Sequence, residues 1–388
     1  MSARRVAVIG AGPIGLEAAL GALARGFEVT VFEKGRVGDN LRRWGSTRFF
    51  SPLAMNLSPR ARAALGARDL PDHALLSGPE MVERVLEPLA GTPALRDRVR
   101  LGCHVRAVGR GRYLRRDLPG HPLRAEKPFR LLVDSARGEE VVEADFVLDA
   151  SGTYEQPAAL GAGGIPAPGE RRCNGRLVRH LGTLDERLSG LSADSRVLLV
   201  GHGHSAANAL LALAALQAPP RVTWATRSAN RRPCQEVAND PLPERDRVTA
   251  GANGLAAAPP SFLTVERRAT VDRLQEANGH LDVALSGGRG GRYDLVIGMT
   301  GYRPDLSFLS ELALDVSPFT EGAARLARRL AGAADCLAVP ALAAADLGSG
   351  EPGFHMVGVK SYGRLPTFLL KTGLGQLETI LDGLTAAG

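Results

Sequence analysis

The chain reads RVAVIGAGPIG from Arg5 to Gly15. A short apolar run thus leads into the pattern G-x-G-x-x-G, and the Ala- and Leu-rich stretch 16–25 that follows predicts a helix. Gly26 ends this helix, and the segment 28–33 predicts a second strand. Strand, glycine loop, helix and strand in this order form the β-α-β unit that binds the ADP part of a dinucleotide. The stretch therefore predicts an α/β fold that begins with a dinucleotide site.

Each glycine of this first loop has a physical role in the predicted site. Gly10 permits the tight turn, Gly12 lets the backbone approach the pyrophosphate, and Gly15 lets the helix pack closely against the strand. The helix N-terminus offers N–H groups and a positive dipole to the phosphates. Glu33 ends the second strand, where a carboxylate accepts hydrogen bonds from ribose hydroxyls. The predicted binding residues are Gly10, Gly12, Pro13, Ile14, Gly15, Glu33 and Lys34. The alternative is a glycine-rich turn without a ligand.

A second copy of the pattern begins at Arg196, where RVLLVGHGHS is followed by a predicted helix, 206–216, and a strand, 221–227. Ser205 and Ala206 replace the third glycine and are still small enough for close packing. The strand ends at Arg227 and not at an acid; an acid there would repel a 2′-phosphate, whereas an arginine pairs with it. We interpret this as a preference for NADPH over NADH, with solvated arginines as the alternative. The predicted site is Gly201, Gly203, His204, Ser205, Ala206 and Arg227.

Two dinucleotide sites in one chain indicate hydride transfer between two cofactors. Two further apolar strands support this, because each runs into a glycine turn, DASGT at 149–153 and MTGYRP at 299–304. Ser151, Gly152 and Gly301 in these turns are candidate cofactor contacts.

The combined pattern resembles the two-dinucleotide-binding-domain flavoproteins, a superfamily that includes thioredoxin-reductase-like enzymes and class B flavin monooxygenases. The resemblance implies an α/β fold of two nested, three-layer Rossmann-like domains. It implies FAD in the first domain, residues 1–154 and 290–388, and NADPH in the second, residues 155–289.

The cysteines narrow the reaction that the resemblance implies. Four cysteines lie far apart at 103, 173, 234 and 336, and no C-x-x-C pair occurs. Relatives of the bacillithiol-disulfide-reductase type carry a cysteine just after the proline of the first loop, where this chain has Ile14. Cys234 is the one thiol that nearby arginines, Arg231 and Arg232, would activate. Sulfur chemistry is therefore disfavoured.

The monooxygenase relatives imply a reaction that needs no protein nucleophile. In them NADPH reduces FAD, O2 adds at flavin C4a, and the hydroperoxide transfers oxygen to a small molecule. We therefore expect an FAD- and NADPH-dependent monooxygenase. The alternatives are an NADPH-dependent reductase or dehydrogenase without oxygen transfer, disulfide-reductase-like enzymes included, and a non-catalytic nucleotide-binding protein. The motif that monooxygenases usually carry between their domains is only approximated by CNGRLVRH at 173–180.

Three more residues are candidates through the resemblance. Asn56 is the best match to a monooxygenase asparagine near the nicotinamide, with a turn-forming role as the alternative. Trp44 would cover the isoalloxazine or belong to the core. Lys360 stands where most of the superfamily has an aspartate on the ribityl chain; it would bring positive charge to the flavin pyrimidine, or be a solvated lysine.

Composition excludes other functions. Lys and Arg total 48 against 41 Asp and Glu, and aromatic residues make up 5%. Basic residues without interleaved aromatics disfavour nucleic-acid binding. His202 and His204 have no neighbouring third ligand, so no metal site is predicted. The chain shows no signal peptide and no apolar run long enough to span a membrane, so we expect a cytoplasmic protein.

Overall fold

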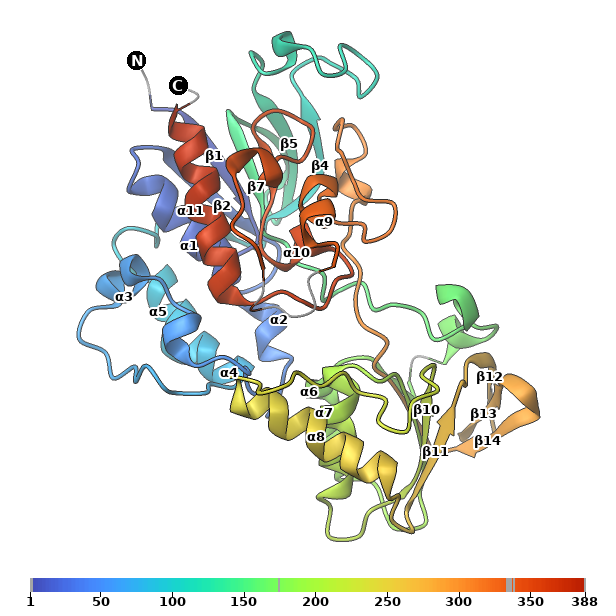
Figure 1. Ribbon diagram of the computed structural model, residues 1–388. Helices are drawn as coiled ribbons and strands as arrows, with labels where there is room; N and C mark the ends of the chain where they lie inside the picture. Colours follow the sequence, from blue (N-terminus) through green and yellow to red (C-terminus); the bar gives the residue numbers. More distant parts are fainter. Residues whose placement is uncertain (1–2, 174, 333–336, 338, 387–388) are drawn as a thin grey trace. The chain divides into compact units, whose positions relative to one another are not determined.

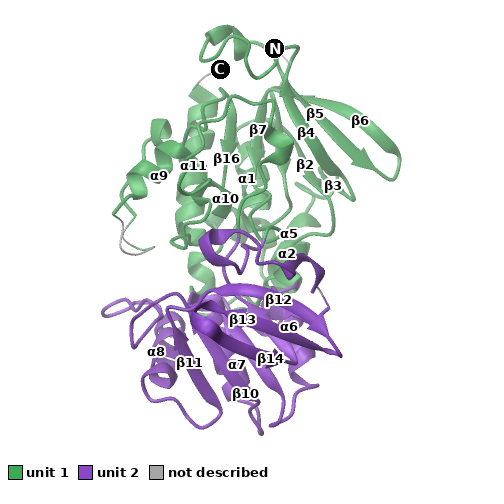
Figure 2. Ribbon diagram, turned by 90° about the vertical axis from the view of Figure 1, so that its right-hand side faces the viewer, with its two compact units in different colours: residues 1–42, 51–156, 303–388 green, residues 43–50, 157–302 purple. Residues whose placement is uncertain are grey.

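The computed structural model describes residues 3–173, 175–332, 337 and 339–386. The chain divides into two compact units, which Figure 2 distinguishes by colour. Unit 1 consists of residues 1–42, 51–156 and 303–388, and unit 2 of residues 43–50 and 157–302.

The centre of unit 1 is a parallel sheet with the strand order β16-β7-β1-β2-β3. Its strands are β1 (Arg5–Ile9), β2 (Glu28–Glu33), β3 (Val99–Leu101), β7 (Phe146–Asp149) and β16 (Phe354–Met356). Successive residues of β1 from Val6 to Ile9 are buried, as expected for a parallel strand that is covered on both faces. Helix α1 (Pro13–Leu23) connects β1 to β2 and packs against α11 (Leu370–Ala386) (Figure 1).

A three-stranded antiparallel sheet completes unit 1. It consists of β4 (His104–Arg110), β5 (Phe129–Ser135) and β6 (Gly138–Ala144). The ring of Phe129 on β5 lies 6.3 Å from that of Phe354 on β16, so the two sheets share apolar contacts. The remaining helical segments of the unit are α2 (Asp39–Arg42), η1 (Leu53–Met55), α3 (Pro59–Leu65), α4 (Gly78–Met81), η2 (Val82–Leu86), α5 (Glu87–Ala90), η3 (Pro122–Arg124), η7 (Ser307–Leu309), α9 (Ala324–Leu330), η8 (Ala344–Leu347) and α10 (Val359–Tyr362).

Unit 2 repeats this architecture. Its parallel sheet has the order β11-β10-β9-β15-β8, formed by β8 (Leu177–Val178), β9 (Arg196–Val200), β10 (Arg221–Thr226), β11 (Leu263–Arg267) and β15 (Leu295–Gly298). An antiparallel sheet contains β12 (Val271–Ala277), β13 (His280–Leu285) and β14 (Arg289–Tyr293). The helical segments are α6 (Leu181–Leu188), α7 (His204–Ala214), α8 (Pro243–Ala257), η4 (Ala162–Gly164), η5 (Glu170–Arg172) and η6 (Ser286–Gly288).

Alternate residues of β9 show why unit 2 has three layers. Val197 and Leu199 pack with residues of α7 and α8 in one apolar cluster. Leu198 and Val200 pack with residues of β12 and β13 in another. Side chains alternate between the two faces of a strand, so the parallel sheet is covered by helices on one face and by the antiparallel sheet on the other. The predicted α/β class with Rossmann-like domains is confirmed.

The boundary between the units differs from the expected one. Residues 290–302 belong to unit 2, because β14 pairs with β13 and β15 pairs with β9. The short segment 43–50 also belongs to unit 2, where Gly182 N donates a hydrogen bond to Arg43 O at 2.9 Å. No helix among the described residues is both long and apolar enough to cross a membrane.

Candidate dinucleotide sites

The first glycine loop, in unit 1, shows which glycines the fold itself requires. Gly10 has φ +101°, and a Cβ added there would lie 2.9 Å from Ala150 O. A Cβ at Gly15 would lie 1.9 Å from Gly10 O, so only glycine allows α1 to approach the loop this closely. A Cβ at Gly12, by contrast, would meet nothing within 4 Å. Gly12 therefore leaves open space beside the N-terminus of α1, which is what the approach of a pyrophosphate requires.

Pro13 and Ile14 begin the helix that follows this loop. Pro13 occupies the first turn of α1, where its missing N–H leaves no helical hydrogen bond unmade. Ile14 is buried, and its side chain lies next to Gly358, where an added Cβ would approach it to 3.2 Å. The position at which relatives of the bacillithiol-disulfide-reductase type are expected to carry a cysteine thus holds an apolar packing residue.

Glu33 is positioned at the carboxyl end of β2. Its Oε2 accepts a hydrogen bond from Ala11 N and its Oε1 accepts one from Gly35 N, both at 2.8 Å. A carboxylate oxygen can accept more than one hydrogen bond, so Glu33 retains capacity for ribose hydroxyls. The adjacent Lys34 is exposed and pairs with Glu155. Glu33 thus fixes the glycine loop and fits the predicted ribose contact.

A buried charge network lies behind the same loop. Lys360 Nζ is 2.7 Å from Asp149 Oδ2, and both side chains have 0% exposure. Lys360 Nζ also donates to Ser151 Oγ at 2.8 Å, and Ser151 Oγ donates to Asp149 Oδ1 at 2.6 Å. The ammonium lies 4.5 Å from the centre of the Phe308 ring. Lys360 is therefore not a solvated lysine, and its charge is compensated inside the chain by Asp149.

Asp149 is the residue of this network that the sequence interpretation missed. It follows three buried apolar residues of β7, and Ala150, next in the chain, is the residue that Gly10 approaches. The available signal was an acid at the end of a buried strand, together with the expectation that Lys360 replaces an aspartate of the superfamily that the chain resembles. Gly152 continues this turn with φ +72°.

Asn56 has the contacts of a turn-forming residue. It is 5% exposed, its Nδ2 donates to Ser51 O at 2.9 Å, and its Oδ1 accepts from Ser51 Oγ at 2.6 Å. Both ends of the amide are thus bonded to one neighbour. Its catalytic role remains a prediction, and the structure supports the alternative that the sequence left open.

Trp44 belongs to unit 2, whereas the first glycine loop belongs to unit 1. Its ring lies 4.8 Å from that of Phe49. This is an apolar contact within the segment 43–50. Covering the isoalloxazine remains a prediction for this residue.

The second glycine loop, in unit 2, has the same geometry as the first. Gly201 has φ +118°, and a Cβ there would lie 2.2 Å from Met299 O, whereas a Cβ at Gly203 would meet nothing within 4 Å. The indole of the buried Trp224 donates to Gly201 O at 2.7 Å and holds the loop in place. His204 and Ser205 form the first turn of α7, and Ala206 is fully buried. The residues fit a second dinucleotide with its phosphates at the N-terminus of α7.

The arginines after β10 differ in their partners. Arg232 pairs with Glu236 at 2.5 Å, and Arg231 donates to Ala257 O at 2.8 Å. Arg227 is exposed and has no ion pair with any acid that the structure describes. Arg227 is therefore the arginine of this group that is available to a phosphate.

The described cysteines are not placed for catalysis. Cys103, Cys173 and Cys234 are free and buried. Burial, with a smaller effect of Glu236, raises the pKa of Cys234 to about 12, so the expectation that Arg231 and Arg232 activate this thiol is wrong. Burial also raises the pKa of Cys173. Cys336 lies outside the described residues.

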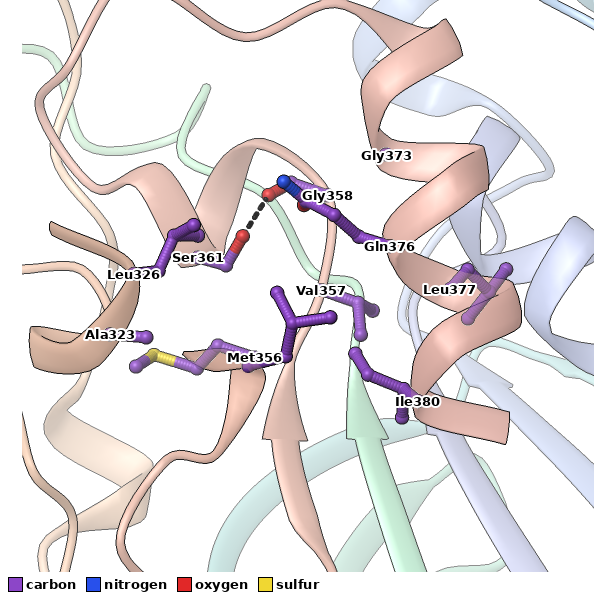
Figure 3. A pocket seen from close by; sticks show the side chains of 11 residues that line it. Ala323, Leu326, Met356, Val357, Gly358, Ser361, Gly373, Gln376, Leu377 and Ile380 are labelled. Carbon is purple, nitrogen blue, oxygen red and sulfur yellow. Dashed lines mark hydrogen bonds between the residues drawn. The ribbon is translucent and has the colours of Figure 1, made fainter. Parts of the chain in front are cut away.

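Unit 1 also contains a cavity. Figure 3 shows a small cavity of unit 1 between β16, α10 and α11. The polar side chains in its wall bond within the chain, Ser361 to Gly358 O and Gln376 to Tyr362 OH, so this is a packing cavity.

Gly301, with φ +89°, accepts a hydrogen bond from Ala158 N in unit 2. The described residues contain no group of three side chains suited to a metal ion.

Known proteins share this architecture. Residues 7–59 match the family described as pyridine nucleotide-disulphide oxidoreductase. Bacillithiol disulfide reductase from Bacillus cereus has a TM-score of 0.69 at 18% identity, over 100% of both chains. Flavin-containing monooxygenase from Stenotrophomonas maltophilia has a TM-score of 0.60 at 18% identity, over 100% of this chain and 99% of that one. Thioredoxin reductase from T. acidophilum has a TM-score of 0.60 at 15% identity, over 99% of both chains. No curated protein matches the sequence.

These likenesses define the class of the fold. The chain has the fold of the two-dinucleotide-binding-domain flavoproteins, and the fold that the resemblance of its motifs implied is confirmed. The neighbours include both reductases and a monooxygenase, so the fold is compatible with both reactions.

Proposed function

We propose that the protein is an FAD- and NADPH-dependent oxidoreductase that transfers an oxygen atom from O2 to a small-molecule substrate. The proposal that the chain binds two dinucleotide cofactors rests on its two glycine loops. Each loop has one glycine, Gly12 or Gly203, at which an added Cβ would meet open space beside a helix N-terminus. FAD would belong to the loop of unit 1 and NADPH to the loop of unit 2. The bound flavin would supply hydride acceptance and oxygen activation.

The chain's own residues bind and orient the cofactors. In unit 1, Gly12 and the first turn of α1 hold the pyrophosphate, while Glu33 accepts hydrogen bonds from the ribose. In unit 2, Gly203 and α7 hold the phosphates, and Arg227 pairs with the 2′-phosphate as a charge-assisted contact.

Thiol chemistry is the reaction that the described residues support least. Cys173 and Cys234 have raised pKa values because of burial, and Ile14 occupies the thiol position of the disulfide-reductase relatives. A thiolate, not a thiol, is the nucleophile in such reductases. An acceptor that needs no protein nucleophile, such as O2, fits these residues better.

A second candidate is an NADPH-dependent reductase without oxygen transfer. It is favoured by the TM-score of 0.69 to a bacillithiol disulfide reductase and by the match of residues 7–59. A non-catalytic nucleotide-binding protein is the third candidate, because the fold alone does not require turnover.

Anaerobic reduction by NADPH, followed by rapid mixing with O2, distinguishes the oxygenase, the reductase and the non-catalytic binding protein. We expect a yellow protein that NADPH bleaches, and then a transient absorbance band distinct from those of oxidised and reduced flavin. Direct reoxidation with stoichiometric peroxide, or rapid reduction of a small disulfide, contradicts the oxygenase and supports the reductase. A colourless protein that does not oxidise NADPH supports the binding protein.

A further inference from the structure

The carboxyl edge of the parallel sheet in unit 2 places His202 beside Arg227. Strands β9 and β10 run parallel with Val200 opposite Ala225. Gly201 N donates to Ala225 O at 3.1 Å, so the ladder extends beyond the end of β9. His202 follows Gly201, and Arg227 follows Thr226, the last residue of β10. Two side chains that can carry positive charge therefore leave neighbouring strands at the same edge.

The neighbouring strand β11 contributes one more arginine to this edge, since Arg267 lies opposite Thr226. The guanidinium of Arg267, on the neighbouring strand β11, donates to the carbonyl oxygens of Asn230, Arg231 and Ala256. His204 begins α7, and its ring lies 5.1 Å from that of Phe50. Burial lowers the pKa of His202, and the charge of Arg227 lowers it further. No acid among the described residues pairs with Arg227. A bound anion would therefore compensate the positive charge at this edge of the sheet.

We propose that His202, in its protonated form, binds the 2′-phosphate of NADPH together with Arg227. This rests on the proposed NADPH site in the second glycine loop. The phosphate dianion would accept a charge-assisted hydrogen bond from each side chain. Because the phosphate also offsets the charge of Arg227, His202 takes up a proton from solvent as the nucleotide binds. His202 would thus be a specificity-determining residue, and 2′-phosphate recognition would weaken as pH rises.

The test compares 2′,5′-ADP with 5′-AMP by calorimetry on the purified holoprotein at pH 7.5, in two buffers of different ionisation enthalpy. At this pH the free phosphate is mostly dianionic, since its second pKa is about 6. We expect the enthalpy of 2′,5′-ADP binding to differ between the buffers, which reports proton uptake, and that of 5′-AMP to be the same in both.

Three variants separate the contributions. His202→Gln should weaken 2′,5′-ADP on the order of tenfold, leave 5′-AMP unchanged and remove the proton uptake. His202→Lys, which keeps a cation, should retain affinity for 2′,5′-ADP without proton uptake. Arg232→Gln is the matched control, because Arg232 already pairs with Glu236, and it should change neither nucleotide.

Failure of this inference can be told apart from failure of the NADPH site. A folded His202→Gln protein that discriminates the two nucleotides as wild type does overturns the inference alone. An equal loss of 2′,5′-ADP and 5′-AMP in both His202 variants also overturns it, since His202 would then act on the loop and not on the phosphate. A wild-type protein that binds neither nucleotide overturns the inference and the NADPH site together.

Discussion

At the scale of single residues, Lys360 shows how a buried charge is accommodated by its surroundings. Its ammonium is surrounded by Asp149, Ser151 and the Phe308 ring, all in unit 1. Removing one member of a buried ion pair leaves an uncompensated buried charge, which is far more costly than losing an exposed pair.

Lys360→Met should therefore lower the free energy of unfolding by about 3–5 kcal/mol. Urea denaturation measures it. Arg36→Met, which breaks an ion pair with Asp39 in which Arg36 is 72% exposed, is the control and should cost about 1 kcal/mol or less. Equal losses in the two variants would contradict a buried ion pair at Lys360.

Cys234 should be unreactive in the folded protein, since its pKa of about 12 leaves almost no thiolate at pH 8. Iodoacetamide followed by peptide mass spectrometry should label Cys234 only after unfolding. Cys234→Ala should keep NADPH oxidation within a few-fold of wild type. A hundred-fold loss of turnover in a folded variant that retains flavin would instead favour a sulfur-based reductase.

The glycines of both loops were predictable from sequence, whereas the partners of Lys360 and Cys234 were not. Gly10 and Gly15 contact each other within one local motif, and a spacing pattern captures such contacts. Lys360 bonds to Ser151, 209 positions away in the chain, and Cys234 packs in an apolar cluster with residues of α8 while its N–H donates to Asn253 Oδ1. A sequence shows which charged residues are close along the chain, as Arg231 and Arg232 are to Cys234. It does not show which ones are close in the folded structure.

At the scale of elements, an ion cluster joins three helices of unit 1. Glu378 on α11 accepts hydrogen bonds from Arg60 on α3, at 2.8 and 3.1 Å, and from Arg25, just beyond α1, at 2.9 Å. The bonds from Arg60 and then Arg25 lower the pKa of Glu378 to about 2, against the opposing effect of burial. The pKa of the folded state is below the ordinary value, so this stabilisation exists at neutral pH and disappears as pH falls from about 4.5 to about 2.

Glu378→Gln should lower the free energy of unfolding at pH 7 by about 1 kcal/mol or less, because Glu378 is 42% exposed and solvent screens the cluster. The difference from wild type should shrink as the urea titrations move to lower pH. Asp382→Asn, at a residue that is 69% exposed, should have a smaller effect. A difference that does not change with pH would show that the charge of Glu378 is not involved.

Element type was easier to predict than element boundaries. The strand 28–33 coincides with β2, yet α1 begins at Pro13 and α7 at His204, each earlier than predicted, because the glycine before each helix already serves as its N-cap. The expected boundary at 290 differs from the end of the compact unit, Tyr302, for another reason. The pairing of β15 with β9 is a long-range contact, which local composition does not encode.

At the scale of the whole molecule, the two loops should be separable by matched substitutions. Gly12 and Gly203 both have ordinary backbone angles, and a side chain at either would meet no protein atom within 4 Å. Gly12→Asp should therefore fold, lose FAD through repulsion of the pyrophosphate, and still bind 2′,5′-ADP. Gly203→Asp should keep FAD and lose 2′,5′-ADP. Flavin absorbance measures the FAD content, and calorimetry measures 2′,5′-ADP binding. A full flavin complement in Gly12→Asp would refute the FAD assignment.

Unit 2 is inserted between segments of unit 1, and this has a consequence for how the chain folds during its synthesis. Unit 2 ends at Tyr302, whereas unit 1 still requires residues 303–388, which include β16, the neighbour of β7. Domains fold as units while the chain emerges from the ribosome. Nascent chains arrested after Tyr302 but before β16 should therefore show a protease-resistant unit 2 and a cleavable unit 1. Residues 1–42 and 51–156 would wait until β16 is translated, with one edge of β7 exposed to chaperones throughout that interval.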